Sequence, residues 1–166
     1  MKPLAIPARM RWLLADPPIQ GRSCGDCQAC CSLLGVKGLP TYPNSYKPPR
    51  QRCEHQCTTG CAIYEDRPAP CAEFSCHWRL GLIAGDERRR PDRFGVMFTA
   101  TDDRGRGQLL VATEVTPGSL EQGAALHTLQ RWTQRDVLIV RRGEHTETFG
   151  PDELLRQVRI DVRERP

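Results

Sequence analysis

The spacing of hydrophobic positions changes along the chain. From about residue 93 onward, hydrophobic residues recur in patterns that are typical of strands and helices. The runs FGVMFTAT (94–101) and QLLVATEV (108–115) are rich in β-branched and aromatic residues, and the DDRGRG between them contains two glycines. Two such runs separated by turn-forming residues predict a β-hairpin. The runs DVLIV (136–140) and HTETF (145–149) predict two further strands.

Two helices are predicted around these strands. Ser119 and Gln122 match a capping box after the turn sequence TPG. Apolar residues then follow at helical spacing, namely Ala125, Leu126, Leu129 and Trp132. The last helix is predicted over residues 151–158, and its apolar face consists of Leu154, Leu155 and Val158. The order of hairpin, helix, strand and helix predicts a small α/β layer within an α+β fold.

The N-terminal half lacks this regularity. Residues 38–52, GLPTYPNSYKPPRQR, are crowded with proline, tyrosine and asparagine and predict a loop. Ordering the backbone costs about 1 to 2 kcal/mol per residue, so a segment that buries little apolar area needs another source of stability. Metal coordination would supply it, because the binding free energy of a structural ion is also folding free energy.

These patterns divide the 166 residues into three regions. Residues 1–22 predict an N-terminal arm that docks through the Trp-Leu-Leu sequence at 12–14. Residues 23–80 form an irregular, cysteine-rich metal-binding half, and residues 93–166 form the small α+β region. The length suits one compact domain in which this cysteine-rich half packs on the α/β layer.

Composition and charge argue against a membrane-spanning, a secreted or a nucleic-acid-binding protein. The chain is 39% hydrophobic and 27% charged, and it contains no aliphatic run long enough to span a membrane. Prolines and arginines interrupt the first twenty residues, so we expect no secretory signal and a cytoplasmic protein. The net charge of +4 is too small to predict a nucleic-acid partner, and the basic run at 87–90 predicts a solvated loop.

All nine cysteines lie between Cys24 and Cys76. Cytosolic thiols are kept reduced, so metal binding explains this segregation better than disulfides. The C-x2-C step from Cys24 to Cys27 lets a tight turn bring two sulfurs to one ion, and the step repeats from Cys27 to Cys30. Adjacent side chains point apart. Cys30 and Cys31 would therefore serve two different ions or separate metals of one polynuclear centre.

The number of thiols suits two sites. A structural zinc and an iron–sulfur cube each take four thiolates, so nine cysteines complete two such sites with one left over. The fourth cysteine of the bacterial ferredoxin motif is missing, as is the C-x3-C-x2-C run of radical enzymes that use S-adenosylmethionine. The expected cofactor is therefore zinc ions or an iron–sulfur cluster, with the identity of the metal left open.

The sequence CGDCQACC, followed by GCAIYEDRPAPCAEFSCHW, resembles the bacterial YkgJ-type cysteine-cluster family. That family is named for its CxxCxxCC motif and is described as a zinc- or iron-chelating domain. The resemblance covers residues 24–78 and leaves Cys57 as a spare thiol. It implies eight metal ligands, which are Cys24, Cys27, Cys30, Cys31, Cys53, Cys61, Cys71 and Cys76. The first four of these would contribute to two centres that the last four complete.

Other residues near the cysteines have predicted supporting roles. Arg67 is the candidate cation that would offset the negative charge of the thiolates. His55 and His77 are second-choice ligands, because each lies within two residues of a cysteine. The side chains predicted to pack over the site are Ile63, Tyr64 and Phe74.

The favoured function is metal binding by a protein that is not an enzyme, because closed four-cysteine sites leave no position for a catalytic water. A metal-dependent enzyme of the redox or methyl-transfer type is the first alternative. Against this alternative, the chain lacks a Gly-rich loop that would bind S-adenosylmethionine. Only Cys57 would be free of metal and able to act as a nucleophile. A nucleic-acid-binding zinc module is the second alternative, although interleaved aromatics and a concentrated basic face are absent from the sequence.

Overall fold

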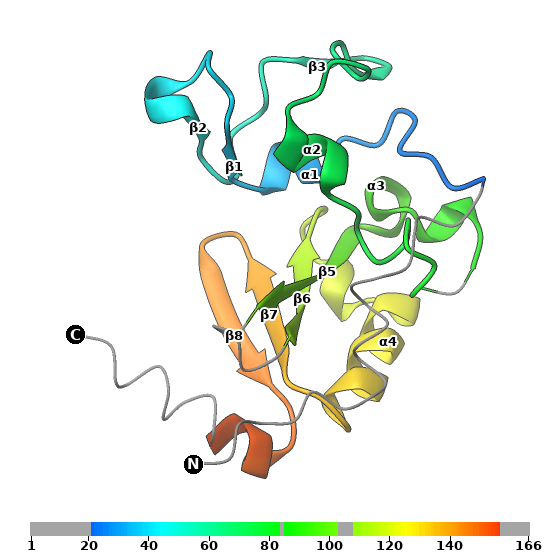
Figure 1. The fold of residues 1–166 in the computed structure, drawn as a ribbon. Coiled ribbons are helices and arrows are strands. Elements are labelled where there is room, and N and C mark those ends of the chain that lie inside the picture. Colours follow the sequence, from blue (N-terminus) through cyan, green and yellow to red (C-terminus); the bar gives the residue numbers. More distant parts are fainter. Residues whose placement is uncertain (1–20, 84, 103–107, 157–166) are drawn as a thin grey trace.

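The computed structural model describes residues 21–83, 85–102 and 108–156, and it has an α+β fold as predicted. The largest sheet in the described residues has four strands. Figure 1 shows a long helix beside this sheet, and an irregular part with short helices and hairpins at one end of it. The predicted arm at 12–14 lies outside the described residues. Within the described ranges, no helix is both long enough and apolar enough to cross a membrane.

The sheet has the strand order β5-β6-β7-β8. Its strands are β5 (Val96–Asp102), β6 (Gln108–Glu114), β7 (Leu138–Arg142) and β8 (His145–Phe149). The pairs β5–β6 and β7–β8 are antiparallel, whereas β6 and β7 are parallel. The predicted hairpin and both later strands are confirmed, with β7 displaced by two residues toward the C-terminus. A parallel pair needs a crossover connection, which the helix α4 (Gly123–Thr133) provides.

The predicted start of α4 is wrong. Ser119–Glu121 forms a separate 3-10 turn, η4, and Gln122 is the N-cap of α4. The side chain of Ser119 is directed at Gly95, where an added Cβ would lie 2.0 Å from Ser119 Oγ, and so it packs there instead of capping a helix. The apolar stripe also differs from the prediction, because Leu126 is 38% exposed while Leu120 is fully buried.

The hydrophobic core lies between one face of the sheet and α4. Val96, Phe98, Leu110 and Leu138 supply the sheet side of this core, and Leu129 supplies part of the helix side. Residues 152–156 are helical, which agrees with the described part of the helix predicted over 151–158; Val158 lies outside the described residues.

The cysteine-rich half is built from short elements. They are α1 (Ala29–Leu33), β1 (Val36–Lys37), η2 (Pro43–Ser45), β2 (Tyr46–Lys47), β3 (Gln56–Cys57), β4 (Gly60–Cys61) and α2 (Ala69–Glu73). The loop predicted over 38–52 is therefore interrupted, because β2 pairs with β1 and turns Lys47 inward. Two further short elements lead into the sheet, η3 (Glu87–Arg89) and α3 (Pro91–Phe94).

Arg90 ties the cysteine-rich half to α3. The solvated loop predicted for 87–90 is wrong at this position, because the Arg90 side chain is only 6% exposed. Its guanidinium pairs with Asp26, in the turn between the first two cysteines, and with Asp92 at 2.7 Å. Charge-assisted hydrogen bonds of this kind are among the stronger polar contacts in proteins.

We expect Arg90→Met to lower the free energy of unfolding by about 1 to 3 kcal/mol, because it removes these contacts at a buried position. Urea unfolding measures the change. Arg88→Met is the matched control, because that side chain is 88% exposed and pairs only locally with Asp86. Equal effects of the two substitutions would contradict the anchoring role of Arg90.

Candidate functional site

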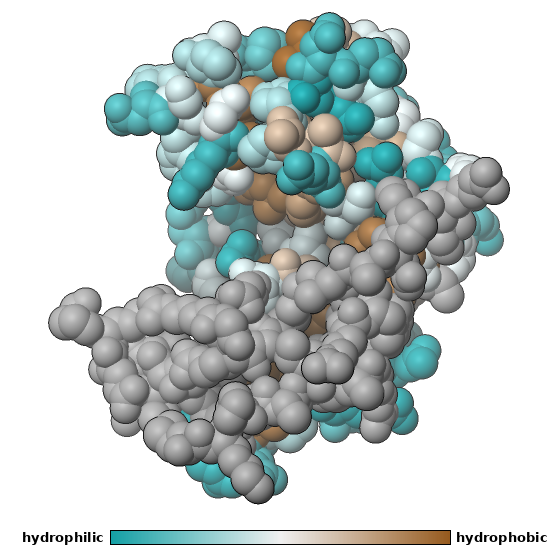
Figure 2. Space-filling model, viewed as in Figure 1, coloured by the Kyte–Doolittle hydropathy of each residue, from teal (hydrophilic) through white to brown (hydrophobic). Residues whose placement is uncertain are grey.

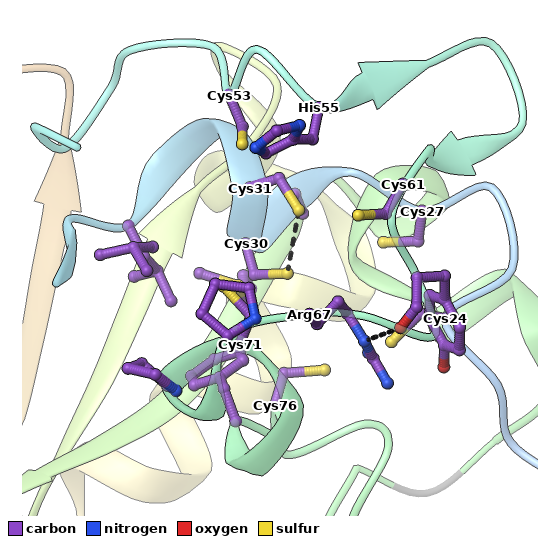
Figure 3. A pocket seen from close by; sticks show the side chains of 18 of the residues that line it. Cys24, Cys27, Cys30, Cys31, Cys53, His55, Cys61, Arg67, Cys71 and Cys76 are labelled. Carbon is purple, nitrogen blue, oxygen red and sulfur yellow. Dashed lines mark hydrogen bonds between the residues drawn. The ribbon is translucent and has the colours of Figure 1, made fainter. Parts of the chain in front are cut away.

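Eight of the nine thiols line one cavity of about 540 Å³ in the cysteine-rich half. Figure 3 shows their side chains around this space, contributed by segments far apart in the sequence. The lining cysteines are Cys24, Cys27, Cys30, Cys31, Cys53, Cys61, Cys71 and Cys76. They are the eight that the resemblance implies as ligands, and Cys57, the predicted spare thiol, lies outside the lining. On the face shown in Figure 2, hydrophobic surface gathers on the cysteine-rich half where it faces the sheet.

A tight turn and α1 place the first four thiols. The Cys27 N–H donates to the Cys24 carbonyl at 2.8 Å, which closes the turn of the C-x2-C step. Gly25 adopts a positive φ of 50° within this turn, a conformation that glycine accepts at little cost. Cys30 and Cys31 then lie on α1.

The β3–β4 hairpin packs directly against this turn. At Gly60, an added Cβ would lie 2.5 Å from the carbonyl oxygen of Gly25, so only glycine allows the close approach. On the other side of the hairpin, the Gln56 side chain donates to Ser32 Oγ at 2.8 Å and to the Gln28 carbonyl at 3.3 Å. These contacts hold Cys61, on β4, beside α1.

Cys71 and Cys76 come from α2 and the segment that follows it. Pro68 is the N-cap of α2, so this short helix begins directly after that proline. Cys76 also packs against the hydrophobic core. The backbone N–H of the next residue, His77, donates to the Phe98 carbonyl at 2.8 Å. The cavity is thereby attached to the outer edge of β5.

Burial favours the protonated form of several cavity thiols. It raises the pKa of Cys27 to about 12, and it also raises the pKa of Cys61, Cys71 and Cys76. These thiols are therefore neutral near pH 7 when no cation is bound. A metal ion would displace their protons, and its affinity would rise with pH.

The adjacent pair Cys30 and Cys31 behaves differently. Their Sγ atoms lie 4.0 Å apart, and the hydrogen bond from the Cys30 thiol lowers the pKa of Cys31 to about 7. The positive charges of Lys47 and Arg67 act in the same direction. The pKa of Cys30 is raised by the same hydrogen bond and by burial. Cys31 is thus the thiol of the pair that ionises first.

Lys47 is a buried cation that the sequence pattern did not reveal. Its side chain is 0% exposed, and Nζ donates to the carbonyls of Leu34 at 2.8 Å and Pro48 at 2.9 Å. Burial lowers the pKa of Lys47, and the charges of nearby thiolates, Cys53 and Cys31 first, oppose that shift. A single lysine in a proline-rich loop has no periodicity. Only the pairing of β2 with β1 shows that it points inward.

Arg67, the cation predicted to offset the charge of the thiolates, lines the cavity. Its Nε donates to the Tyr64 carbonyl at 2.6 Å, and its Cζ lies 3.6 Å from the centroid of the Tyr64 ring. These two contacts fix the guanidinium in the cavity wall. The predicted packing residues Ile63, Tyr64 and Phe74 line the same cavity.

The two histidines near the cysteines have different surroundings. His55 lines the cavity, and its Nε2 lies 3.5 Å from Glu54 Oε1, so it stays a second-choice ligand. His77 is 2% exposed, and its ring packs edge-on against Trp132 with centroids 6.1 Å apart. Burial lowers the pKa of His77 to about 4. Its place is in the hydrophobic core and not in the cavity wall.

Cys57 is a half-buried thiol at the end of β3, beside the exposed turn of the β3–β4 hairpin. A hydrogen bond from Thr59, with Oγ1 at 3.4 Å from Sγ, lowers the pKa of this thiol. Alkylation of Cys57 should therefore become half-maximal at a lower pH than alkylation of an unperturbed thiol. Thr59→Val should move that midpoint upward and slow alkylation at pH 7, as measured by mass spectrometry. Thr58→Val is the matched control, and an identical pH profile for Thr59→Val and the unmodified protein would refute the role of Thr59.

The chemistry of the donor set fits a thiophilic metal, because thiolates are the preferred ligands of zinc and of iron–sulfur clusters. Arg67 and Lys47 supply positive charge beside these thiols. Within the described ranges, no three cysteine, histidine or carboxylate side chains already stand in a geometry that would hold one ion. Zinc–sulfur bonds are about 2.3 Å long, so coordination would draw the cavity walls inward.

No protein-family model matches this chain, and neither a curated protein nor a solved structure shows significant similarity to it. The resemblance to the YkgJ-type family therefore stays a prediction from the cysteine motif. The assignment of candidate ligands depends on the residues and on their positions around the cavity.

Proposed function

We propose that this protein binds metal through the eight cavity thiols, as zinc ions or as an iron–sulfur cluster. The observation that supports it is the separation of the cysteines, eight around one cavity and Cys57 outside it. Thiols that served only as small core residues would pack against other side chains and would leave no such space between them. The same function is the one that the resemblance to the YkgJ-type family implies.

The bound metal would stabilise the cysteine-rich half as well as occupy it. This half consists of two-residue strands and single-turn helices, and among its described residues the buried hydrophobic side chains are those of Ala29, Leu39 and Trp78. Elements this short need a further source of stability. Structural zinc contributes about 10 to 16 kcal/mol to the folding of small zinc peptides. A location in the cytoplasm would keep the eight thiols reduced and available to the metal.

Purification without oxygen, followed by analysis of metal and acid-labile sulfide per chain, tests the proposal. Two zinc ions per chain and a colourless protein would indicate two four-thiolate sites. Brown protein with sulfide and broad visible absorption would indicate an iron–sulfur cluster. A folded protein that contains no metal, and takes up neither zinc nor iron with sulfide after reduction, would contradict metal binding.

A further inference from the structure

The adjacent thiols of α1 lie close together although they occupy consecutive positions on a helix. Consecutive helical side chains point about 100° apart, an angle that normally separates neighbours. The Sγ atoms of Cys30 and Cys31 are nevertheless 4.0 Å apart and share a hydrogen bond, drawn as a dashed line in Figure 3. Both side chains therefore reach one part of the cavity, whereas the sequence predicted that they would point apart.

This separation suits two ligands of one tetrahedral ion. Zinc–sulfur bonds of about 2.3 Å, opened to the tetrahedral angle, place two sulfur atoms about 3.8 Å apart. The two thiols need to approach by only about 0.2 Å to bind one zinc ion, and their protons pass to solvent as it binds. An iron–sulfur cube instead binds each thiolate to a different iron, and the sulfide between the irons keeps the thiolates farther apart.

The backbone that carries the pair is held at both ends of α1. At the start of the helix, the Gln28 side chain donates to the Cys57 carbonyl, and the Gln28 carbonyl accepts from the Gln56 side chain at 3.3 Å. At the end of the helix, the Leu34 carbonyl accepts from Lys47 Nζ at 2.8 Å. Contacts within the protein therefore fix the short segment that brings the two sulfurs together.

We propose that Cys30 and Cys31 bind the same ion as a chelating pair, which selects a single tetrahedral ion such as zinc over an iron–sulfur cube. This inference rests on the proposed metal binding and specifies the kind of metal and the coordination mode at one part of the same site. Because the ion needs both sulfurs, losing either thiol should have the same effect as losing both.

The rest of the cavity lining determines what else this ion can bind. Among the described residues, the lining includes eight cysteines and His55 but no aspartate or glutamate. A closed zinc site takes four protein ligands. The pair supplies half of that number, and other lining thiols supply the remainder.

The zinc content of variants tests the shared ion. The reduced full-length chain, loaded with zinc and dialysed against a chelator, should retain two ions. Cys30→Ser, Cys31→Ser and Cys30→Ser/Cys31→Ser should each retain one, because all three damage the same site. A double variant that retains none, or that retains both, would overturn the shared ion. Cys57→Ser is the control and should retain two ions, and circular dichroism checks that the sheet is folded in each variant.

Alkylation at partial zinc loading tests the pair without a substitution. Trypsin releases both thiols in one peptide, residues 23–37. At half-saturating zinc, reaction of every free thiol with iodoacetamide should leave Cys30 and Cys31 of each peptide either both modified or both protected, as read by mass spectrometry. Peptides modified at one of the two would overturn the shared ion. A chain that binds no zinc at all would instead refute the proposed function, so the two failures are distinguishable.

Discussion

Cys27→Ser is expected to halve the metal content of the purified protein, whereas Cys57→Ser should leave it unchanged. Cys27 lies half-buried in the cavity wall at the end of the C-x2-C turn, and serine offers a poor ligand for zinc or iron in its place. Cys57 lies outside the cavity lining, at the end of β3. Metal analysis by mass spectrometry, normalised to the protein concentration, measures both values. Equal losses in the two variants would refute the assignment of Cys57 as the spare thiol.

The same substitution should also loosen the cysteine-rich half. Trypsin should cut Cys27→Ser rapidly after Arg50 and Arg52, at the end of the proline-rich segment, while the sheet stays intact. A structural metal site contributes enough folding energy that losing it exposes the backbone it holds. Cys57→Ser again serves as the control and should be cut at the rate of the unmodified protein.

Lys47→Met should weaken metal binding in the cavity by about 10- to 100-fold, the usual range for residues that support metal ligands. Methionine keeps much of the side-chain volume but removes the charge beside Cys53 and Cys31 and the two hydrogen bonds to backbone carbonyls. Competition with a zinc chelator of known affinity measures the change.

Lys37→Met is the matched control for this prediction. Lys37 lies on the neighbouring strand β1, opposite Tyr46; it also lines the cavity, but its side chain is exposed, unlike that of Lys47. Because water screens an exposed charge, its removal should change zinc affinity less than about twofold. If both lysine variants bind zinc equally well, the buried cation has no part in holding the metal.

The sheet half was predictable from the sequence because its signals are local. Alternating and β-branched runs determine where β5, β6 and β8 lie, and a single helix must connect the parallel pair. The start of α4 was predicted wrongly because Ser119 packs against Gly95, a tertiary contact that overrides the capping pattern. Sequence patterns carry no information on such contacts.

The sequence predicted which thiols line the candidate site, but not which charged side chains are buried near it. Cysteine spacing and the family resemblance singled out the eight thiols that line the cavity. Neither could show that Lys47 and Arg90 are buried, because a charged residue in a loop or basic run is usually solvated. Their burial depends on the pairing of β2 with β1 and on the approach of Asp26 to α3.

X-ray absorption at the edge of the bound metal tests the central claim most directly, because it measures the atoms that the metal contacts. Zinc in this cavity should be surrounded by four sulfur atoms at about 2.3 Å, and iron in a cluster should likewise have an all-sulfur first shell. A first shell composed of oxygen and nitrogen, at about 2.0 to 2.2 Å, would show that the eight thiols do not hold the metal.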